Sequence, residues 1–488
     1  LSRDSRSVGL NALERFDLAA GLRLEDASVG FAEVIAGMES STQLGVRAAG
    51  PIAGLQAELR PWDLDQWTLT GTAVADWQHL DARRTNTDLD VMMDVSRTLA
   101  EGSTLRLGVR AVDLGREFFT NLTSGANQLD VEQRSEQRLD VSGDVVYAVV
   151  PQLSFGLVSR LSGGAVDRAY EDPVAAVPLT SVERRLRELI IDVEGYAEVR
   201  LPMLTFIGGA SVYSRAEQNG VANVHGLDAD DLEAIRSQEY QRDNTTVRTR
   251  MFGRGEWRPS ALDTVRLDVS GWLLRYDTPS AGNDDDRDEL ANIATLTYAR
   301  RLGRVVTMSL GVSGQYLHLV FLRSTRSALN NVNRVLRLSP SFHVTGGVVT
   351  MQPQFEILAN YTVYDYEGTA SSVRSFSFRQ LSYRDSIRVR LAPQFTAESQ
   401  VLFRYFERST LLWSEFAETP QTGNLEYLTK LLIFSHPSAA WSVGAGIRLY
   451  TLEQRTILMG LPSVNTGSVH SVGPEAALRF EAPGGSLL

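Results

Sequence analysis

Apolar and polar side chains alternate at successive positions over many short stretches of the chain. In the stretch YRDSIRVRLA, Ile387, Val389 and Leu391 alternate with Arg388 and Arg390. A period of two is typical of an extended strand, because successive side chains of a strand point to opposite faces. One face of this strand is aliphatic and the other is cationic, so the two faces need different surroundings.

The same alternation predicts strands of about ten residues throughout the chain. Further examples lie at 138–149, 191–201, 264–273, 306–316, 336–344, 354–363 and 441–449. Short links, several with Gly or Pro, predict nine tight hairpins at 60–66, 99–103, 150–152, 201–203, 258–263, 302–304, 346–347, 392–394 and 436–438. Between them lie long polar segments, 25–41, 80–87, 118–135, 164–187, 217–245, 277–290, 322–333, 365–373, 409–423 and 454–471.

Long strands joined by alternating short turns and long loops resemble the outer-membrane β-barrels of Gram-negative bacteria. Nine hairpins with flanking strands near 16–24 and 476–480 predict an all-β fold, a single antiparallel up-and-down transmembrane barrel of about 20 strands (range roughly 18–22). It would form one domain over 1–488, with strands from about 15 to 482 and its longest loop at 217–245. The resemblance implies short periplasmic turns and long extracellular loops. Because the expected number is even, both termini should be periplasmic.

A soluble array of β-sandwich modules is the alternative. It predicts strands of about five or six residues and an internal repeat of about ninety residues, and neither pattern is visible. Aromatic residues near the predicted strand ends, such as Tyr147, Trp257 and Tyr361, favour a membrane, where interfacial girdles are expected.

Composition removes other classes. No apolar run approaches the roughly 18 residues that a membrane helix needs. The chain has no cysteine, which excludes disulfides and thiolate metal sites. Its six histidines are scattered, and no nucleophile elbow or phosphate-binding loop is present. We therefore expect no enzyme activity, no cofactor, no metal site and no nucleic-acid partner.

The net charge is −11, and the acids concentrate in predicted loops. Solvated loops are the simplest interpretation; the alternatives are cation bridging to lipopolysaccharide phosphates and attraction of a basic partner. The segment 227–238 has helix-like spacing, and it would either fold inward as a constriction or cap a loop outside. The candidate constriction or acidic-loop residues are Asp228, Asp230, Asp231, Glu233, Asp284, Asp285 and Asp286.

The predicted lumen face is rich in arginine instead. Its candidates are Arg248, Arg250, Arg254, Glu256, Arg266, Asp268, Arg337, Arg384, Arg388, Arg390, Arg404 and Arg448. We expect many of these arginines to pair with acids. A surplus of guanidinium groups would still favour anions, which they bind in a fork.

These patterns predict a bacterial outer-membrane protein in contact with lipid and lipopolysaccharide. It would act as a porin-like conduit for anionic solutes or an acidic polymer. The alternative is a structural scaffold that anchors or encloses a periplasmic or surface protein, lipoprotein or filament. No plug domain precedes the first predicted strand, which argues against a TonB-dependent transporter within these residues.

Overall fold

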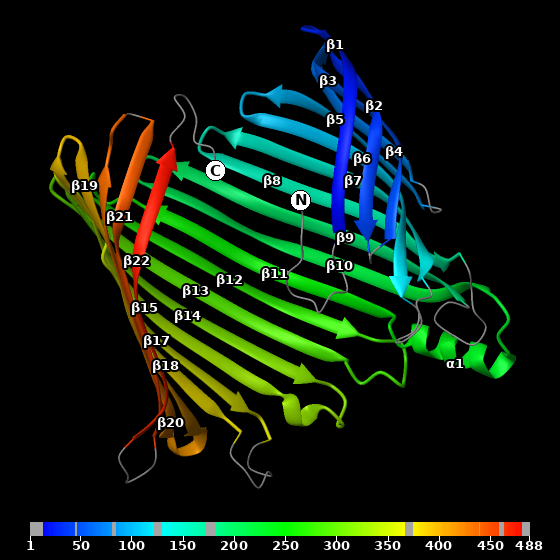
Figure 1. Ribbon diagram of the computed structural model, residues 1–488. Helices are drawn as coiled ribbons and strands as arrows, with labels where there is room; N and C mark the ends of the chain where they lie inside the picture. The colour runs from blue at the N-terminus through cyan, green and yellow to red at the C-terminus, as the bar shows by residue number, and fades with distance from the viewer. Residues whose placement is uncertain are drawn as a thin grey trace. The chain divides into compact units, whose positions relative to one another are not determined.

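The computed structural model describes residues 13–43, 46–80, 84–121, 129–171, 182–366, 374–438, 440–457 and 463–480. Within these ranges the chain forms an antiparallel up-and-down sheet of 22 strands (Figure 1). The strands are β1 Leu13–Asp26, β2 Gly30–Gln43, β3 Val46–Leu64, β4 Trp67–Leu80, β5 Arg84–Ala100, β6 Ser103–Asn121, β7 Leu129–Val150, β8 Leu153–Tyr170, β9 Val182–Leu201, β10 Leu204–Val224, β11 Asn244–Trp257, β12 Asp263–Asp277, β13 Arg287–Leu302, β14 Val306–Phe321, β15 Asn331–Thr345, β16 Val349–Met351, β17 Gln354–Tyr364, β18 Phe376–Ala392, β19 Phe395–Leu412, β20 Ala417–Ser435, β21 Trp441–Thr456 and β22 Val464–Phe480.

Apart from β16 and β17, the strands are clearly longer than the predicted ten or so residues. β1 has 14 residues and β7 has 22. An apolar band about 25 Å tall is crossed by only about 9–11 tilted residues, so apolar alternation marks only part of each strand. In the first half of β7, the stretch Glu132–Arg138 is polar on both faces, and its strand character comes from pairing with β6 and β8. Strands thus extend into segments that were predicted as loops.

The 22 strands exceed the predicted value of about 20 and lie at the upper limit of the predicted range of 18–22. All nine predicted short links do fall at turns between consecutive strands. However, the predicted polar segment 25–41 contains a further hairpin, in which β1 pairs with β2 from Leu13↔Gln43 to Asp26↔Gly30. One side of β2 mixes Phe31 and Ile35 with Glu33 and Glu39, which hides the dyad pattern.

β16 and β17 occupy one position in the sheet. Both pair with β15 on one side and β18 on the other, and Pro353 lies between them. Proline has no N–H to donate to a ladder, so it interrupts the strand there. The number of strand positions in the sheet is therefore not the same as the number of strands, so an even strand count no longer supports periplasmic termini. The orientation of the termini stays a prediction.

The chain divides into two compact units, each described by itself. Unit 1 contains Leu1–Glu198, Gly209–Thr249 and Leu274–Asp286, and unit 2 contains Val199–Gly208, Arg250–Leu273 and Arg287–Leu488. In unit 1, β1 to β8 pair consecutively as antiparallel neighbours. In unit 2, β13 to β22 do the same, with β16 and β17 sharing one place.

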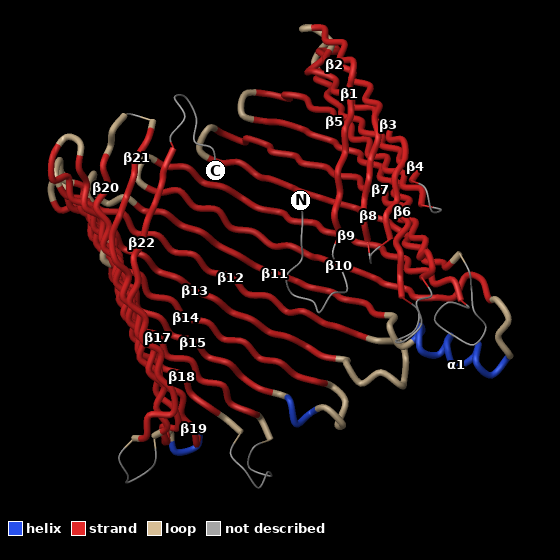
Figure 2. The backbone as a smooth tube through the Cα atoms, in the orientation of Figure 1, coloured by secondary structure: helices blue, strands red, loops and turns tan. Residues whose placement is uncertain are grey.

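The helical segments are short. The α-helix α1, Ala229–Tyr240, follows β10 in unit 1, and the 3-10 helices η1 (Ser327–Leu329) and η3 (Trp413–Glu415) are single turns in unit 2 (Figure 2). α1 confirms the helix-like spacing seen at 227–238. Among the described segments, no helix has the length and apolar character needed to cross a membrane.

The sheet carries its bare apolar surface on one face. In β7, Leu139, Val141 and Tyr147 are 52%, 42% and 55% exposed, whereas Asp140 between them is only 7% exposed. This reverses the usual arrangement, in which apolar side chains are covered and charges are open to solvent. An apolar surface of this extent needs an apolar partner or lipid against it.

Candidate functional site: the charged face of the sheet

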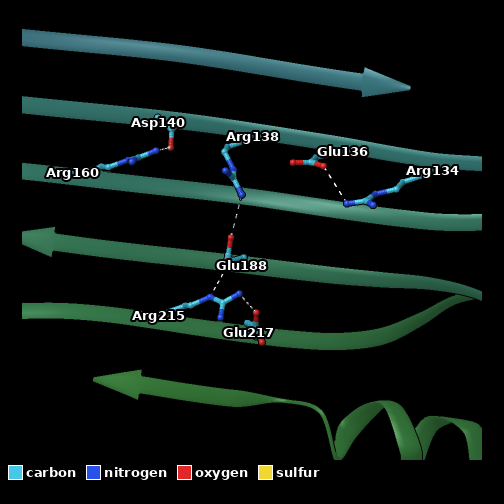
Figure 3. Close-up of polar contacts among 8 residues, drawn as sticks. All are labelled: Arg134, Glu136, Arg138, Asp140, Arg160, Glu188, Arg215 and Glu217. Carbon is cyan, nitrogen blue, oxygen red and sulfur yellow. Dashed lines mark hydrogen bonds and ion pairs between the residues drawn. The ribbon is translucent and has the colours of Figure 1, made fainter. Parts of the chain in front are cut away.

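Charged side chains gather on the face of unit 1 opposite the bare apolar side chains. On β7 this polar face carries Arg134, Glu136, Arg138 and Asp140 at alternate positions (Figure 3). Period-two geometry places all four on one side of the strand. The polar face is therefore set by the sequence of β7, and its partners are set by the register of the neighbouring strands.

Carboxylates and guanidinium groups alternate across β7 to β10. Arg160 on β8 donates to Asp140 at 3.1 Å, and Arg138 lies 3.4 Å from Glu188 on β9. Arg215 on β10 donates to the same Glu188 and also pairs with Glu217 (Figure 3). Glu188 thus joins arginines from two other strands. We call this set of ion pairs the charge ladder.

The ladder continues through β5 and β6. Arg110 donates two hydrogen bonds to the Asp90 carboxylate, from Nε to Oδ1 at 2.9 Å and from Nη2 to Oδ2 at 2.5 Å. Arg116 reaches Asp88 at 3.3 Å. Ion pairs of this kind have favourable hydrogen-bond geometry. Each contributes only modestly to the free energy of folding where water reaches it.

In unit 2 the structure pairs five of the predicted arginines with carboxylates. The pairs are Arg254–Asp268 at 2.7 Å, Arg266–Glu256 at 2.7 Å, Arg337–Glu356 at 3.2 Å, Arg388–Glu398 at 2.9 Å and Arg404–Glu426. Glu398 also binds Arg479 at 2.7 Å. The expectation that many of these arginines pair with acids is confirmed for this group.

Five predicted arginines have no ion pair with a carboxylate in the part of the chain that the structure describes. Arg248 stacks on Tyr213 at 5.3 Å and Arg250 on Phe252 at 5.0 Å, while Arg384 and Arg390 have neither ion pair nor ring contact. Arg448 lies opposite Lys430 in the β20–β21 register. Positive charge is therefore in local surplus at these places.

The predicted acidic residues are parts of loop structure. Asp228 caps α1 by accepting a bond from the Asp231 backbone N–H at 2.8 Å, with Asp230 and Glu233 in the helix that follows. Asp286 accepts from the Thr278 backbone and hydroxyl at 2.7 and 2.6 Å, in the loop that also holds Asp284 and Asp285. Over the described ranges, no three His, Asp or Glu side chains are grouped to hold a metal ion.

Comparison with known proteins places the fold. No family model and no curated protein matches the sequence. The ferric citrate transporter FecA, however, is structurally similar, with a TM-score of 0.51 and 9% identity over 97% of this chain and 77% of that one. The fold is that of an outer-membrane β-barrel protein. At this identity the likeness shows the fold alone.

Two other solved structures give weaker matches. The alcaligin receptor FauA from Bordetella pertussis has a TM-score of 0.47 at 10% identity, covering 97% of this chain and 76% of its own. The copper transporter OprC has a TM-score of 0.45 at 11% identity, covering 95% and 74%. Both scores fall below 0.5, so no argument rests on them. The expectation against a TonB-dependent transporter stays a prediction.

The individual residues of the charge ladder were not predicted from the sequence. None of Arg134, Arg138, Arg160 and Arg215 was among the predicted lumen candidates. Their signal was present, because Arg138 and Asp140 alternate with Leu139 and Val141. The partner strands were hidden, since β8 and β9 extend into the predicted loop 164–187.

Proposed function

We propose that this chain is an outer-membrane conduit whose polar face lines a water-filled passage for polar solutes and favours anions. The bare apolar face would contact lipid and lipopolysaccharide, and the charged face would contact water. Outer-membrane barrels present their apolar side chains outward and their polar side chains inward. The alternating exposure in β7 supports this assignment of the two faces.

The observation that carries the anion preference is the set of arginines without carboxylate partners. Ion pairs such as Arg254–Asp268 contribute no net charge to a passage, whereas Arg248, Arg250, Arg384 and Arg390 each contribute one positive charge. In a confined polar passage, uncompensated guanidinium groups lower the barrier for anions and raise it for cations.

The loop that contains α1 is the candidate constriction. Glu239 near the end of α1 is 3% exposed and lies 3.5 Å from Arg184 of β9. Arg184 is four residues before Glu188, so it belongs to the polar face that carries the charge ladder. This contact supports an inward position of the loop, which would narrow the passage.

The test is reversal potential in a planar bilayer under a salt gradient. The wild type should conduct with anions favoured, and replacing Arg248, Arg250, Arg384 and Arg390 by Gln should move the reversal potential towards cations. The matched control is Arg254→Gln with Asp268→Asn, which removes a whole ion pair and leaves the net charge unchanged. This control should keep the wild-type reversal potential.

A scaffold that encloses a partner protein predicts the opposite behaviour. A silent bilayer, together with a protein that co-purifies in fixed proportion, would reverse the proposal. Equal reversal potentials for wild type and the fourfold variant would leave a conduit without the proposed anion preference.

A further inference from the structure

Three arginines lie directly opposite one another on neighbouring strands of unit 1. The register pairs Arg116 of β6 with Arg134 of β7, and Arg134 with Arg168 of β8. Opposite side chains on one sheet face have Cβ atoms about 4.5–5.5 Å apart, and like charges at that spacing are destabilising. Nothing in strand formation requires such a row.

The row borders a cleft at the end of the polar face. The cleft is lined by Arg134, Arg168, Arg184 and Arg242, with Glu239 of α1 among them. We call it the arginine cleft. It lies on the part of β7 and β8 that continues beyond the apolar band, near α1 and the connections of the predicted long-loop side.

Positive charge exceeds negative charge in the arginine cleft. Glu239 serves both Arg184 at 3.5 Å and Arg242 at 3.1 Å, so one carboxylate faces two guanidinium groups. Arg134 has only a long contact of 3.4 Å to Glu136. Arg168 has no hydrogen bond or ion pair to any described residue and is exposed.

The Nε of Arg184 lies 3.5 Å from Glu239 Oε1, and it makes no hydrogen bond to a described residue. This long contact compensates the guanidinium only in part, so Arg184 adds to the positive charge of the cleft.

We propose that the arginine cleft binds a soluble solute carrying two or more phosphate or carboxylate groups. Guanidinium groups bind these oxyanions through paired N–H donors. Adjacent arginines such as Arg134 and Arg168 can hold separate oxyanion groups of one molecule, while a single anionic group would leave part of the row uncompensated. The inference deepens the proposed function and rests on its assignment of the polar face to water.

That assignment also separates a soluble solute from a lipid headgroup. Lipid would lie against the apolar face of the sheet, whereas Arg134 and Arg168 share the face of the charge ladder. The ligand is therefore expected to arrive from water.

Equilibrium binding to the purified full chain in detergent tests the proposal, with inorganic pyrophosphate as the probe and acetate as the single-charge comparison. Wild type should bind pyrophosphate far more tightly than acetate. Arg168→Gln and Arg134→Gln should each weaken pyrophosphate binding about tenfold or more, the value of one lost charge-assisted bond. Arg168→Lys, which keeps the charge but not the fork, should lose less.

Arg97→Gln is the matched control. Arg97 lies near the tight turn after β5, on the face opposite Asp88 and Asp90, so its loss removes one positive charge outside the cleft. Its pyrophosphate affinity should stay within about twofold of wild type, because Arg97 lies at the tight-turn end of β5, away from the cleft, and charge effects are screened beyond about 10 Å. Heat-modifiable gel migration confirms that each variant is folded.

Three outcomes would overturn the inference: no pyrophosphate binding by wild type, equal affinity for acetate, or unchanged affinity in folded Arg168→Gln and Arg134→Gln. The bilayer result is independent of these. If the chain binds pyrophosphate in the cleft but does not conduct, the proposed conduit function is wrong and the proposed binding site stands. A chain that conducts without binding would do the reverse.

Discussion

Arginines lie both in the middle and at the loop end of the polar face in unit 1, but their neighbours differ in charge. In the middle, the register sets Arg106 opposite Asp144 and Arg110 opposite Asp140. Ten positions or fewer along the same strand, Arg116 is opposite Arg134. The first region neutralises its own charge, and the second accumulates it.

The difference shows that alternation and register act separately. Alternation sends every second side chain of β6, β7 and β8 to the polar face in both regions. Register then decides whether an arginine meets an acid or another arginine. A region of matched charges stabilises the sheet, whereas a region of like charges costs stability and is suited to binding an anion.

The largest effect on stability should come from placing a charged side chain on the apolar face. Val141→Arg places a charge in the apolar band of β7 and should lower the free energy of unfolding in lipid by about 2–4 kcal/mol. Ser142→Arg, one position along on the polar face, should change it by only about 0.5 kcal/mol. Reversible denaturant unfolding in lipid vesicles measures both, and equal losses would contradict the assignment of the faces.

The second-largest loss of stability should come from removing the carboxylate that two arginines of the charge ladder share. Glu188 is 15% exposed at its side chain, and Glu188→Gln leaves Arg138 and Arg215 without their common partner. The expected loss is about 1–3 kcal/mol, because partly buried charges become unsatisfied. The control Glu58→Gln changes an exposed acid on β3. If both variants unfold at the same denaturant concentration, the ladder does not stabilise the sheet.

Relieving the arginine row should have a smaller effect of the opposite sign. Without anion, Arg168→Gln should raise the free energy of unfolding by about 0.2–1 kcal/mol, because it removes a like charge opposite Arg134. Arg168→Lys keeps the repulsion and should resemble wild type. A destabilised Arg168→Gln in phosphate-free buffer would show that the row is compensated.

The smallest effect is expected at the open edge of the ladder. Asp90 and Arg110 are 36% and 48% exposed at their side chains, so Asp90→Asn should cost about 0–1 kcal/mol. The loss should shrink as salt rises from 0.05 to about 1 M, because the Debye length falls to about 3 Å. A salt-independent loss in unfolding titrations would indicate that the pair is shielded from water.

Much of the fold followed from local pattern, and the errors have a common cause. The nine short links and the alternating strands were predicted because a tight turn and a dyad repeat are encoded within a few residues. β2 was missed because Glu33 and Glu39 share a side with Phe31 and Ile35. The first parts of β7 and β9 lie in predicted loops, since their strand structure comes from cross-strand hydrogen bonds, which hydropathy does not report.

The sequence by itself determined which side chains share a face. The alternation of Leu139 and Val141 with Arg138 and Asp140 follows from strand geometry alone, whatever the neighbouring strands are. Only the tertiary structure decided which side chains contact one another across that face. Glu188 joins Arg138 and Arg215, and Arg134 meets Arg116 and Arg168, because strand register brings together residues up to fifty positions apart. Local chemistry cannot specify that register, since a strand can form the same backbone hydrogen bonds with many partners.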